Sequence, residues 1–179
     1  MRLSLTILLI LCSAAGCQNH PREPIVQAPE VDIARFMGDW YVIANIPTPF
    51  EKRAWNAVER YHDSGDGYIA TTFTYNRDGF DGPEKRYNAR GFVREGSNGA
   101  VWGMQFLWPF RADYRVMHLD EDYGVTIIGR EKRDFLWIMA RTPTIPETEF
   151  DRLLEICSEA GYDLSELRLV PQQPLAERG

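Results

Sequence analysis

The sequence has little cysteine and little histidine, with three of each among 179 residues. Three cysteines are too few for the disulfide framework of a small secreted domain. The three histidines form no recognisable arrangement with a serine or cysteine nucleophile, and no spacing of Cys, His and carboxylates indicates zinc. The sequence therefore predicts a protein that is not an enzyme and that holds neither a metal nor a cofactor.

An excess of positive charge is also lacking, because the formal net charge is −6 at pH 7. Nucleic-acid binding calls for a basic domain, so the composition excludes nucleic acid as a partner. The chain also lacks an apolar run of roughly 20 residues, the length that a membrane-spanning helix needs. The remaining function classes are those of a domain that binds a small molecule or another protein.

The N-terminus has the features of a secretory signal in residues 1–16. A charged start is followed by an apolar run over residues 3–11 and by a small-residue exit, Ser13-Ala14-Ala15-Gly16. Because Cys17 comes directly after this exit, the segment resembles a lipobox and predicts a lipid attached to Cys17. Gln18 after the cysteine predicts sorting to the bacterial outer membrane. The alternative is an ordinary signal cut near Gly16, with a free thiol at Cys17.

The rest of the chain is divided into a tether, one domain and a short tail. Residues 17–30 contain Pro21, Pro24 and Pro29 and little to bury, which predicts a lipidated tether. An extended tether of this length reaches roughly 40 Å. Residues 31–171 are enough for one domain with a substantial core. Residues 172–179 are left as a C-terminal tail.

Short β-like runs separated by turn signals fill the first two thirds of this domain. The predicted strands are residues 38–46, 54–62, 68–75, 85–93, 100–108, 111–119, 124–131 and 135–141. Short loops between consecutive strands indicate antiparallel pairing. Eight strands in up-and-down order close into a barrel that can hold one small ligand. The predicted fold class is therefore all-β, an eight-stranded antiparallel up-and-down barrel.

One α-helix is predicted after the last strand. Thr144 and Glu147 have the spacing of a capping box around Pro146, and Gly161 is placed to end the helix. The apolar positions at helical spacing are Phe150, Leu153, Leu154, Cys157 and Ala160. One apolar stripe needs one surface to cover, so we expect the helix to pack on the outside of the barrel. Cys157 is then a small buried apolar residue and not a nucleophile.

Three motifs occur in an order and at a spacing that resemble one known family. They are Gly38-Asp39-Trp40, Asp113-Tyr114 and Arg141. Over residues 31–171 the chain resembles the lipocalins, above all the bacterial outer-membrane lipoprotein lipocalins and apolipoprotein D. The resemblance implies a barrel open at one end and closed at the other by Gly38, Trp40 and Arg141. It leaves both a monomer and a homodimer open.

Alternation of side chains along each strand predicts which residues point into the barrel. The inward sets are Trp40, Val42, Ala44 and Ile46; Ile69, Thr71, Phe73 and Tyr75; Trp102, Met104, Phe106 and Trp108; Tyr114, Val116 and His118; and Phe135, Trp137 and Met139. On the pattern alone such aromatic residues fill a solid core more often than they line a pocket. The resemblance to lipocalins implies an open cavity instead. His118 is predicted as a neutral, hydrogen-bonded residue near the barrel floor, with haem ligation as the alternative.

The predicted ligand is a fatty acid or a lysophospholipid inside the barrel. We expect its chain to contact Trp137, Phe135, Tyr114, Met104, Phe106 and Val116, and its head group to lie near Arg111, Lys132 or Arg133. The loops at the open end are richer in cations than the turns at the closed end, which favours a carboxylate or phosphate head group. The alternative is that these are solvated loop charges with no common partner.

Two functions from different classes follow. The first is a membrane-anchored lipocalin that stores or transports a hydrophobic ligand. The second is a cell-envelope module with a filled barrel that recognises another protein through its loops. A fatty acid or lysophospholipid should stabilise the first by mass action and leave the second unchanged.

Overall fold

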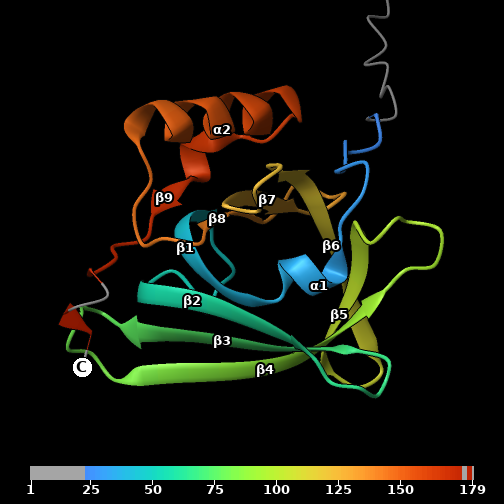
Figure 1. The fold of residues 1–179 in the computed structure, drawn as a ribbon. Helices are drawn as coiled ribbons and strands as arrows, with labels where there is room; N and C mark the ends of the chain where they lie inside the picture. Colours follow the sequence, from blue (N-terminus) through green and yellow to red (C-terminus); the bar gives the residue numbers. More distant parts are fainter. Residues whose placement is uncertain (1–22, 175–176, 179) are drawn as a thin grey trace, which may run out of the picture.

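The computed structural model describes residues 23–174 and 177–178. Eight strands close into an antiparallel barrel (Figure 1). They are β1 (Gly38–Ile46), β2 (Ala54–Asp63), β3 (Ile69–Arg77), β4 (Glu84–Val93), β5 (Val101–Leu107), β6 (Phe110–Leu119), β7 (Val125–Gly129) and β8 (Leu136–Ala140). Each strand pairs with the next along the chain, and β1 pairs with both β2 and β8. The predicted barrel is confirmed. The predicted signal segment and Cys17 lie outside the described residues.

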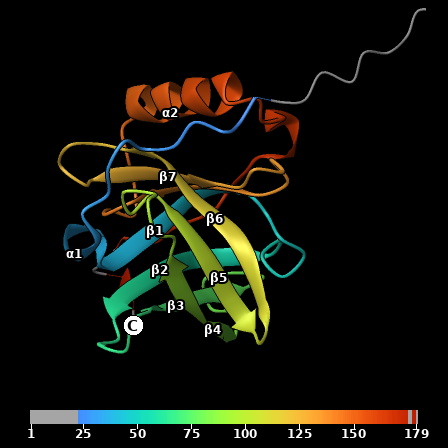
Figure 2. The same ribbon diagram turned by 90° about the vertical axis from the view of Figure 1, so that its right-hand side faces the viewer.

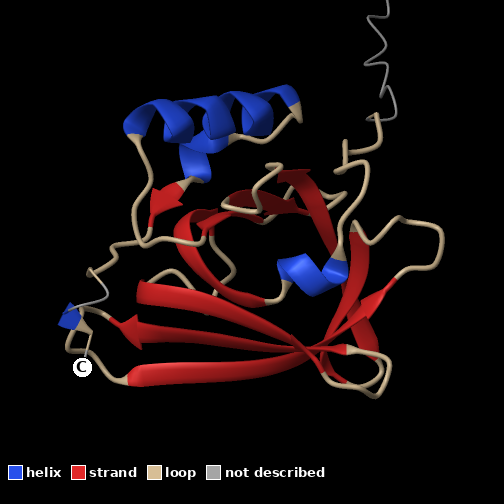
Figure 3. Ribbon diagram, viewed as in Figure 1, coloured by secondary structure: helices blue, strands red, loops and turns tan. Residues whose placement is uncertain are grey.

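A short helix, α1 (Ile33–Phe36), crosses one end of the barrel (Figure 3). Asp32 caps its start, because the Asp32 carboxylate accepts hydrogen bonds from the backbone N–H groups of Ala34 and Arg35. Phe36 is fully buried against Trp40, with the two ring centres 4.9 Å apart. The helix and Trp40 together form the closed floor of the barrel.

Arg141 fastens this floor to the strands. Its guanidinium donates hydrogen bonds to the carbonyl oxygens of Arg35, Phe36, Met37, Asp39 and Tyr123. Three of these carbonyls belong to the end of α1, where the helix itself leaves them without a partner. The guanidinium carbon of Arg141 also lies 3.8 Å from the centre of the Trp40 ring. The predicted contact between Trp40 and Arg141 is confirmed.

Gly38 lies where a larger residue would disturb this floor. Its φ is +102°, in the region that favours glycine, and an added Cβ would lie 3.3 Å from a guanidinium nitrogen of Arg141. The tight approach explains the glycine two residues before Trp40.

A β-bulge in β1 overturns part of the predicted inward set. The register against β8 shifts between Val42 and Ala44, so the extra residue reverses the alternation. Trp40 and Val42 point into the barrel as predicted, whereas Ala44 and Ile46 lie outside, in the apolar cluster beneath the C-terminal helix. Asn45, which is 2 % exposed, takes the inward position instead.

A second bulge, in β6, moves His118 out of the barrel. The register against β7 shifts between Val116 and His118, so Val116 stays inside while His118 faces outward. Its Nε2 lies 3.3 Å from a guanidinium nitrogen of Arg152 on the outer helix. Burial, together with the charge of Arg152, lowers the pKa of His118. The predicted position near the floor, and with it haem ligation inside the barrel, was wrong.

The C-terminal helix, α2 (Glu147–Glu159), covers the outside of the barrel over β7 and β8 (Figure 1). Leu153 and Cys157, on the face of α2 that contacts the barrel, are fully buried. Burial raises the pKa of the Cys157 thiol to about 12, so the thiol stays protonated. Gly161 follows the helix with φ +83°. The predicted capping box was wrong, because Pro146 caps the helix without a side-chain hydrogen bond. In the described part of the chain, no helix is long and apolar enough to cross a membrane.

Both ends of the described chain pack on the barrel more closely than predicted. Ile25 and Ala28 are buried, and the Ala28 N–H donates to the Val116 carbonyl at 2.8 Å. The expectation that this stretch has little to bury was therefore wrong for the residues that the structure describes. After the 3₁₀ helix Leu164–Glu166, a two-residue strand, β9 (Arg168–Leu169), pairs with β1. The side-chain amide of Gln172 then donates to the carbonyls of Val42 and Ala57.

The floor contact makes a prediction about stability. Trp40→Ala should lower the free energy of unfolding by about 3–5 kcal/mol, the usual cost of truncating a buried aromatic residue. Combining it with Arg141→Ala should reveal a coupling of about 0.5–3 kcal/mol, because the two side chains are in contact. Urea unfolding of the two single variants and the double variant measures the coupling.

A matched control pairs Trp40→Ala with Arg90→Ala. Arg90 lies over the ring of Tyr68 on the outer surface, whereas Trp40 points into the barrel, so these two losses should add. Additive losses for Trp40 and Arg141 as well would contradict the stacked arrangement.

Candidate functional site: a cavity inside the barrel

The barrel encloses a cavity of about 470 Å³ above its floor. The lining residues come from the β1–β2 loop, from β2 to β6, from the β7–β8 loop and from β8. Most of them are apolar: Thr48, Pro49, Phe50, Glu51, Glu59, Thr71, Phe73, Tyr87, Ala89, Met104, Phe106, Ala112, Asp113, Tyr114, Arg130, Phe135 and Trp137. The floor residues Trp40, Phe36 and Trp102 are packed together below it. The cavity therefore opens at the end opposite α1.

Most of the predicted ligand contacts line this cavity. Trp137, Phe135, Tyr114, Met104 and Phe106 all lie in its wall. Val116 does not, because it is fully buried in the interior cluster. Strand alternation is regular on both sides of Trp137 and along β5 up to Met104, which explains why the facing of these two residues could be predicted from the sequence.

The predicted rim cations do not line the cavity. The Arg111 guanidinium lies 3.7 Å from the centre of the Phe92 ring on the outer surface. Arg133 is held by the carbonyls of Ala160, Glu131 and Glu23, also outside. Lys132 is exposed and is absent from the lining as well. None of the three cations therefore belongs to the wall of the cavity, and a head group near Arg111, Lys132 or Arg133 stays a prediction.

Arg130 supplies the positive charge of the cavity. Its side chain lies 5.2 Å from the centre of the Phe135 ring, and one terminal nitrogen bonds Asp134 at 3.2 Å. Its Nε is buried, and no group among the described residues accepts a hydrogen bond from it. Arg130 is the penultimate residue of the predicted strand 124–131, and nothing in the sequence distinguishes it from the cations of the neighbouring loops.

Glu51 holds the β1–β2 loop across the wall of the cavity. One oxygen, Oε2, accepts hydrogen bonds from the Thr48 N–H, the Asn45 side-chain amide and the Trp137 indole N–H, at 3.1, 3.3 and 3.2 Å. Burial raises the pKa of Glu51, and these three donors partly offset the rise. The carboxyl thus fixes the orientation of Trp137. The bulge that turns Asn45 inward brings this cluster together, so strand alternation alone could not reveal it.

Glu59 is a second buried carboxyl in the same cavity, and it differs from Glu51 in having no such donors. Among the residues that the structure describes, none donates a hydrogen bond to its Oε2. Burial, reinforced by the negative charge of Glu51, raises the pKa of Glu59 to about 8. The group is therefore largely protonated at neutral pH. Glu59 lies two residues from Ala57 and two from Tyr61, which both point into the barrel, so strand alternation could have indicated that Glu59 points inward.

Tyr114 connects the cavity to the floor. Its hydroxyl lies 2.6 Å from the hydroxyl of Tyr61, and its ring stacks on Trp102 with the ring centres 5.1 Å apart. The carboxylate of the neighbouring residue, Asp113, accepts hydrogen bonds from Arg115 and from the Glu131 N–H, so it links β6 to the loop after β7. No group of three His, Cys, Asp or Glu side chains in the described part of the chain is placed to hold a metal ion.

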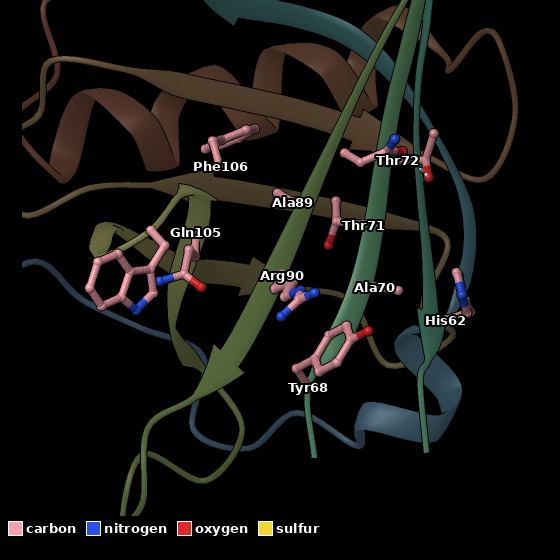
Figure 4. A pocket seen from close by; sticks show the side chains of 11 residues that line it. His62, Tyr68, Ala70, Thr71, Thr72, Ala89, Arg90, Gln105 and Phe106 are labelled. Carbon is pink, nitrogen blue, oxygen red and sulfur yellow. Dashed lines mark hydrogen bonds between the residues drawn. The ribbon is translucent and has the colours of Figure 1, made fainter. Parts of the chain in front are cut away.

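A second hollow lies on the outer surface of β3, β4 and β5 (Figure 4). It is lined by polar groups such as His62, Tyr68, Arg90 and Gln105. It meets the inner cavity at three shared residues, Thr71, Ala89 and Phe106, because β4 pairs with β5 only from Arg90 to Val93. The lining of the outer hollow is as polar as it is apolar, whereas the inner cavity is more enclosed and mostly apolar, so the inner cavity is the better candidate for a ligand site.

Figure 2 shows the hairpin between β5 and β6. Its tip is apolar and exposed, and one residue of the tip, Phe106, also lines the cavity. Phe106, Leu107, Trp108 and Phe110 are 62, 71, 81 and 73 % exposed. Trp108 was predicted to point inward with Trp102 and Met104, but the register of the hairpin shifts after Met104. Phe50, in the opposite loop of the mouth, is also 71 % exposed.

Comparison with known proteins identifies the family. The model of the lipocalin-like domain matches residues 31–172. The chain belongs to the lipocalin family. The outer membrane lipoprotein Blc of Vibrio cholerae is 30 % identical over 173 residues, covering 93 % of this chain and 98 % of that protein. Temperature-induced lipocalin-1 of Arabidopsis thaliana is 31 % identical over 79 % of this chain and 80 % of its own. Mouse apolipoprotein D is more distant, at 26 % identity over 93 % of this lipocalin and 95 % of its own length.

Solved structures agree on the fold. Insecticyanin from Manduca sexta matches with a TM-score of 0.66 and 13 % identity, over 88 % of each chain. Lobster apocrustacyanin A1 matches with a TM-score of 0.63 over 86 % of this lipocalin and 93 % of its own chain. Lipocalins are generally proteins that bind or transport small hydrophobic ligands.

Glu59 predicts how the stability of this lipocalin depends on pH. Its pKa in the folded protein, about 8, lies above the ordinary value of 4.5. Between these two pH values the unfolded chain has lost the proton that the folded protein keeps, so stability falls as pH rises, by about 1.4 kcal/mol per unit from this group. Glu59→Gln should therefore become more stable relative to the wild type between pH 5 and pH 8, as measured by urea unfolding.

Glu84→Gln provides the control, because Glu84 is an exposed carboxyl paired with Arg86 on the surface. It should shift stability little at either pH. A Glu59→Gln variant whose difference from the wild type is the same at both pH values would contradict a raised pKa.

Proposed function

We propose that this lipocalin binds the acyl chain of one fatty acid or lysophospholipid inside the barrel, for storage or transport. The observation that carries the proposal is the enclosed apolar cavity of about 470 Å³, which lies in the range of roughly 300–1,000 Å³ usual for small-molecule sites. The filled barrel of the alternative, a loop-based protein-interaction module, has no such space.

The walls of the cavity suit a hydrocarbon chain. Phe73, Met104, Phe135 and Trp137 offer apolar surface, and the charges near them are either paired or, at Glu59, neutralised by protonation. Each methylene that moves from water into this space contributes about 0.8 kcal/mol. We infer that the chain lies along Trp137 and Phe135 and extends down toward Tyr114.

The mouth of the cavity suits the polar head of the same ligand. Arg130 places a guanidinium in the wall, and its Nε lacks an acceptor among the described residues. A carboxylate or phosphate is the natural acceptor for such a group. The exposed tip formed by Phe106, Leu107, Trp108 and Phe110 supports uptake from a lipid surface, since clustered exposed apolar residues mark interaction sites.

We also propose that Cys17 carries the lipid that anchors the protein to the bacterial outer membrane. The support is the small-residue exit before Cys17 and the kinship with proteins named as outer membrane lipoproteins in Vibrio cholerae and Escherichia coli. The plant relative does not bear that name, so this part of the proposal needs its own test.

The ligand proposal is tested with a series of fatty acids and lysophospholipids of increasing chain length. Affinity should rise about fourfold for each added methylene until the cavity is full, because about 0.8 kcal/mol corresponds to that factor. Binding is followed by tryptophan fluorescence, which should change when a chain packs against Trp137. Trp137→Phe should remove most of this signal.

Trp55→Phe is the matched control. Trp55 packs edge-on against Phe80, 4.8 Å between ring centres, and does not line the cavity, so its replacement should leave the signal intact. Affinities that do not depend on chain length, or a signal that survives the loss of Trp137, would refute an acyl chain in the barrel.

The anchor is tested by following the protein through cell fractionation. Wild-type protein should partition with the outer membrane, and Cys17→Ala should be soluble or remain unprocessed, because no thiol is left to acylate. Mass spectrometry of the mature N-terminus reports the lipid directly. Recovery of soluble wild-type protein with a free thiol at Cys17 would rule out the anchor while leaving the ligand proposal untouched.

A further inference from the structure

Three buried polar atoms without a hydrogen-bond partner all belong to residues that line the cavity. They are Glu59 Oε2, Thr71 Oγ1 and Arg130 Nε, and no other described residue has such an atom. Buried polar groups in folded proteins are nearly always hydrogen-bonded, since leaving one unpaired costs free energy. Their coincidence in one cavity indicates that the ligand itself supplies the missing partners.

Glu59 and Thr71 lie deep in the cavity. Glu59 is opposite Trp40 of the floor in the register of β1 and β2. Ala54, where β2 begins at the mouth, is five residues earlier, which is roughly 15 Å along a strand. Arg130 follows the end of β7 at the mouth, so a head group held there lies nearer the mouth than Glu59 does. The group that reaches Glu59 then belongs to the chain of the ligand.

The two side chains are placed to share one small polar group. Glu59 is opposite Phe73 in the register of β2 and β3, so Thr71 is its diagonal neighbour on the same face, at roughly 7 Å between Cβ atoms. An oxygen between them makes two hydrogen bonds of about 2.8 Å each, which fits this separation once the length of the glutamate is counted. Thr71 is only 4 % exposed, so its hydroxyl is largely withdrawn from bulk solvent.

A hydroxyl has the chemistry that this pair requires. A protonated carboxyl and a threonine hydroxyl can each donate and each accept, and so can an alcohol. Glu51 shows the contrast within the same cavity, because three N–H donors of the protein already satisfy its Oε2. A plain hydrocarbon chain would leave Glu59 and Thr71 desolvated and unpaired.

We propose that Glu59 and Thr71 form a polar subsite that selects acyl ligands bearing a hydroxyl group in the distal half of the chain. The proposal rests on the proposed function, namely that the cavity takes an acyl chain with its head group at the mouth. It makes Glu59 and Thr71 specificity-determining residues, while Trp137 and Phe135 provide the general affinity for a chain.

The test compares stearate, 2-hydroxystearate and 12-hydroxystearate by titration calorimetry near neutral pH. The wild type should bind 12-hydroxystearate about tenfold more tightly than stearate, the factor that corresponds to one well-made hydrogen bond of about 1.4 kcal/mol. 2-Hydroxystearate should resemble stearate, because its hydroxyl stays near the mouth. Stearylamine is included, because an amine would bind most tightly if Glu59 acted as a counter-ion.

Variants of Glu59 and Thr71 test whether these two side chains determine the ratio of the affinities for 12-hydroxystearate and stearate. Glu59→Met and Thr71→Val should each bring the ratio of affinities close to one, chiefly by improving the binding of stearate. Glu59→Gln should keep the preference, because an amide still donates and accepts. Thr72→Val is the matched control: Thr72 faces outward and bonds Asn88, so its loss should leave the ratio unchanged. Thr71→Val keeps the test decisive if Glu59→Met does not fold.

The outcomes are distinct. Stearate and 12-hydroxystearate of equal affinity in the wild type would overturn the subsite and leave the proposed function standing, with water as the partner of both side chains. Stearylamine as the tightest ligand would overturn the hydroxyl in favour of a cation. A ratio unchanged in both Glu59→Met and Thr71→Val would place the selectivity elsewhere. Failure of all these compounds to bind would refute the proposed function itself.

Discussion

The guanidinium of Arg141 is the contact on which the closed end of the barrel depends. It joins the last strand of the barrel to the end of α1, the start of β1 and the turn before β7 through hydrogen bonds to backbone carbonyls. A planar group with five N–H donors can satisfy so many acceptors at once, and its face remains free to cover Trp40. These contacts hold the strand ends that form the closed end of the barrel, below the cavity.

Two bulges then divide the apolar residues of the chain between two clusters. One cluster fills the bottom of the barrel around Trp40 and Trp102, and the other lies between the barrel wall and α2 around Leu153 and Ile138. The bulge in β1 sends Ala44 to the outer cluster and turns Asn45 inward, where it bonds Glu51. The same local irregularity therefore supports the outer helix and shapes the wall of the cavity.

The cavity combines apolar walls with a few polar groups at different depths. Arg130 and Glu51 lie toward the mouth, while Glu59 and Thr71 lie near the floor. The low polarity around Glu59 raises its pKa, so the carboxyl is kept as a neutral hydrogen-bonding group at neutral pH. Polar groups in such a cavity give little affinity by themselves, but they make the site distinguish between ligands that satisfy them and ligands that do not.

The sequence by itself determined the barrel, the outer helix and the floor. The alternation of apolar and polar residues along each strand, the short turns and the apolar stripe of one helix are all local patterns in the sequence. The Gly38–Trp40 and Arg141 motifs identify which ends of the first and last strands lie together. It also placed Trp137, Phe135, Tyr114, Met104 and Phe106 in the wall, because alternation is regular at most of these positions.

Only the tertiary structure decided where alternation breaks, since a bulge depends on the partner strand and leaves no mark in composition. His118 and Ala44 were misplaced for that reason. The unpaired state of Glu59 and Thr71 could likewise emerge only after every neighbouring donor and acceptor had been positioned.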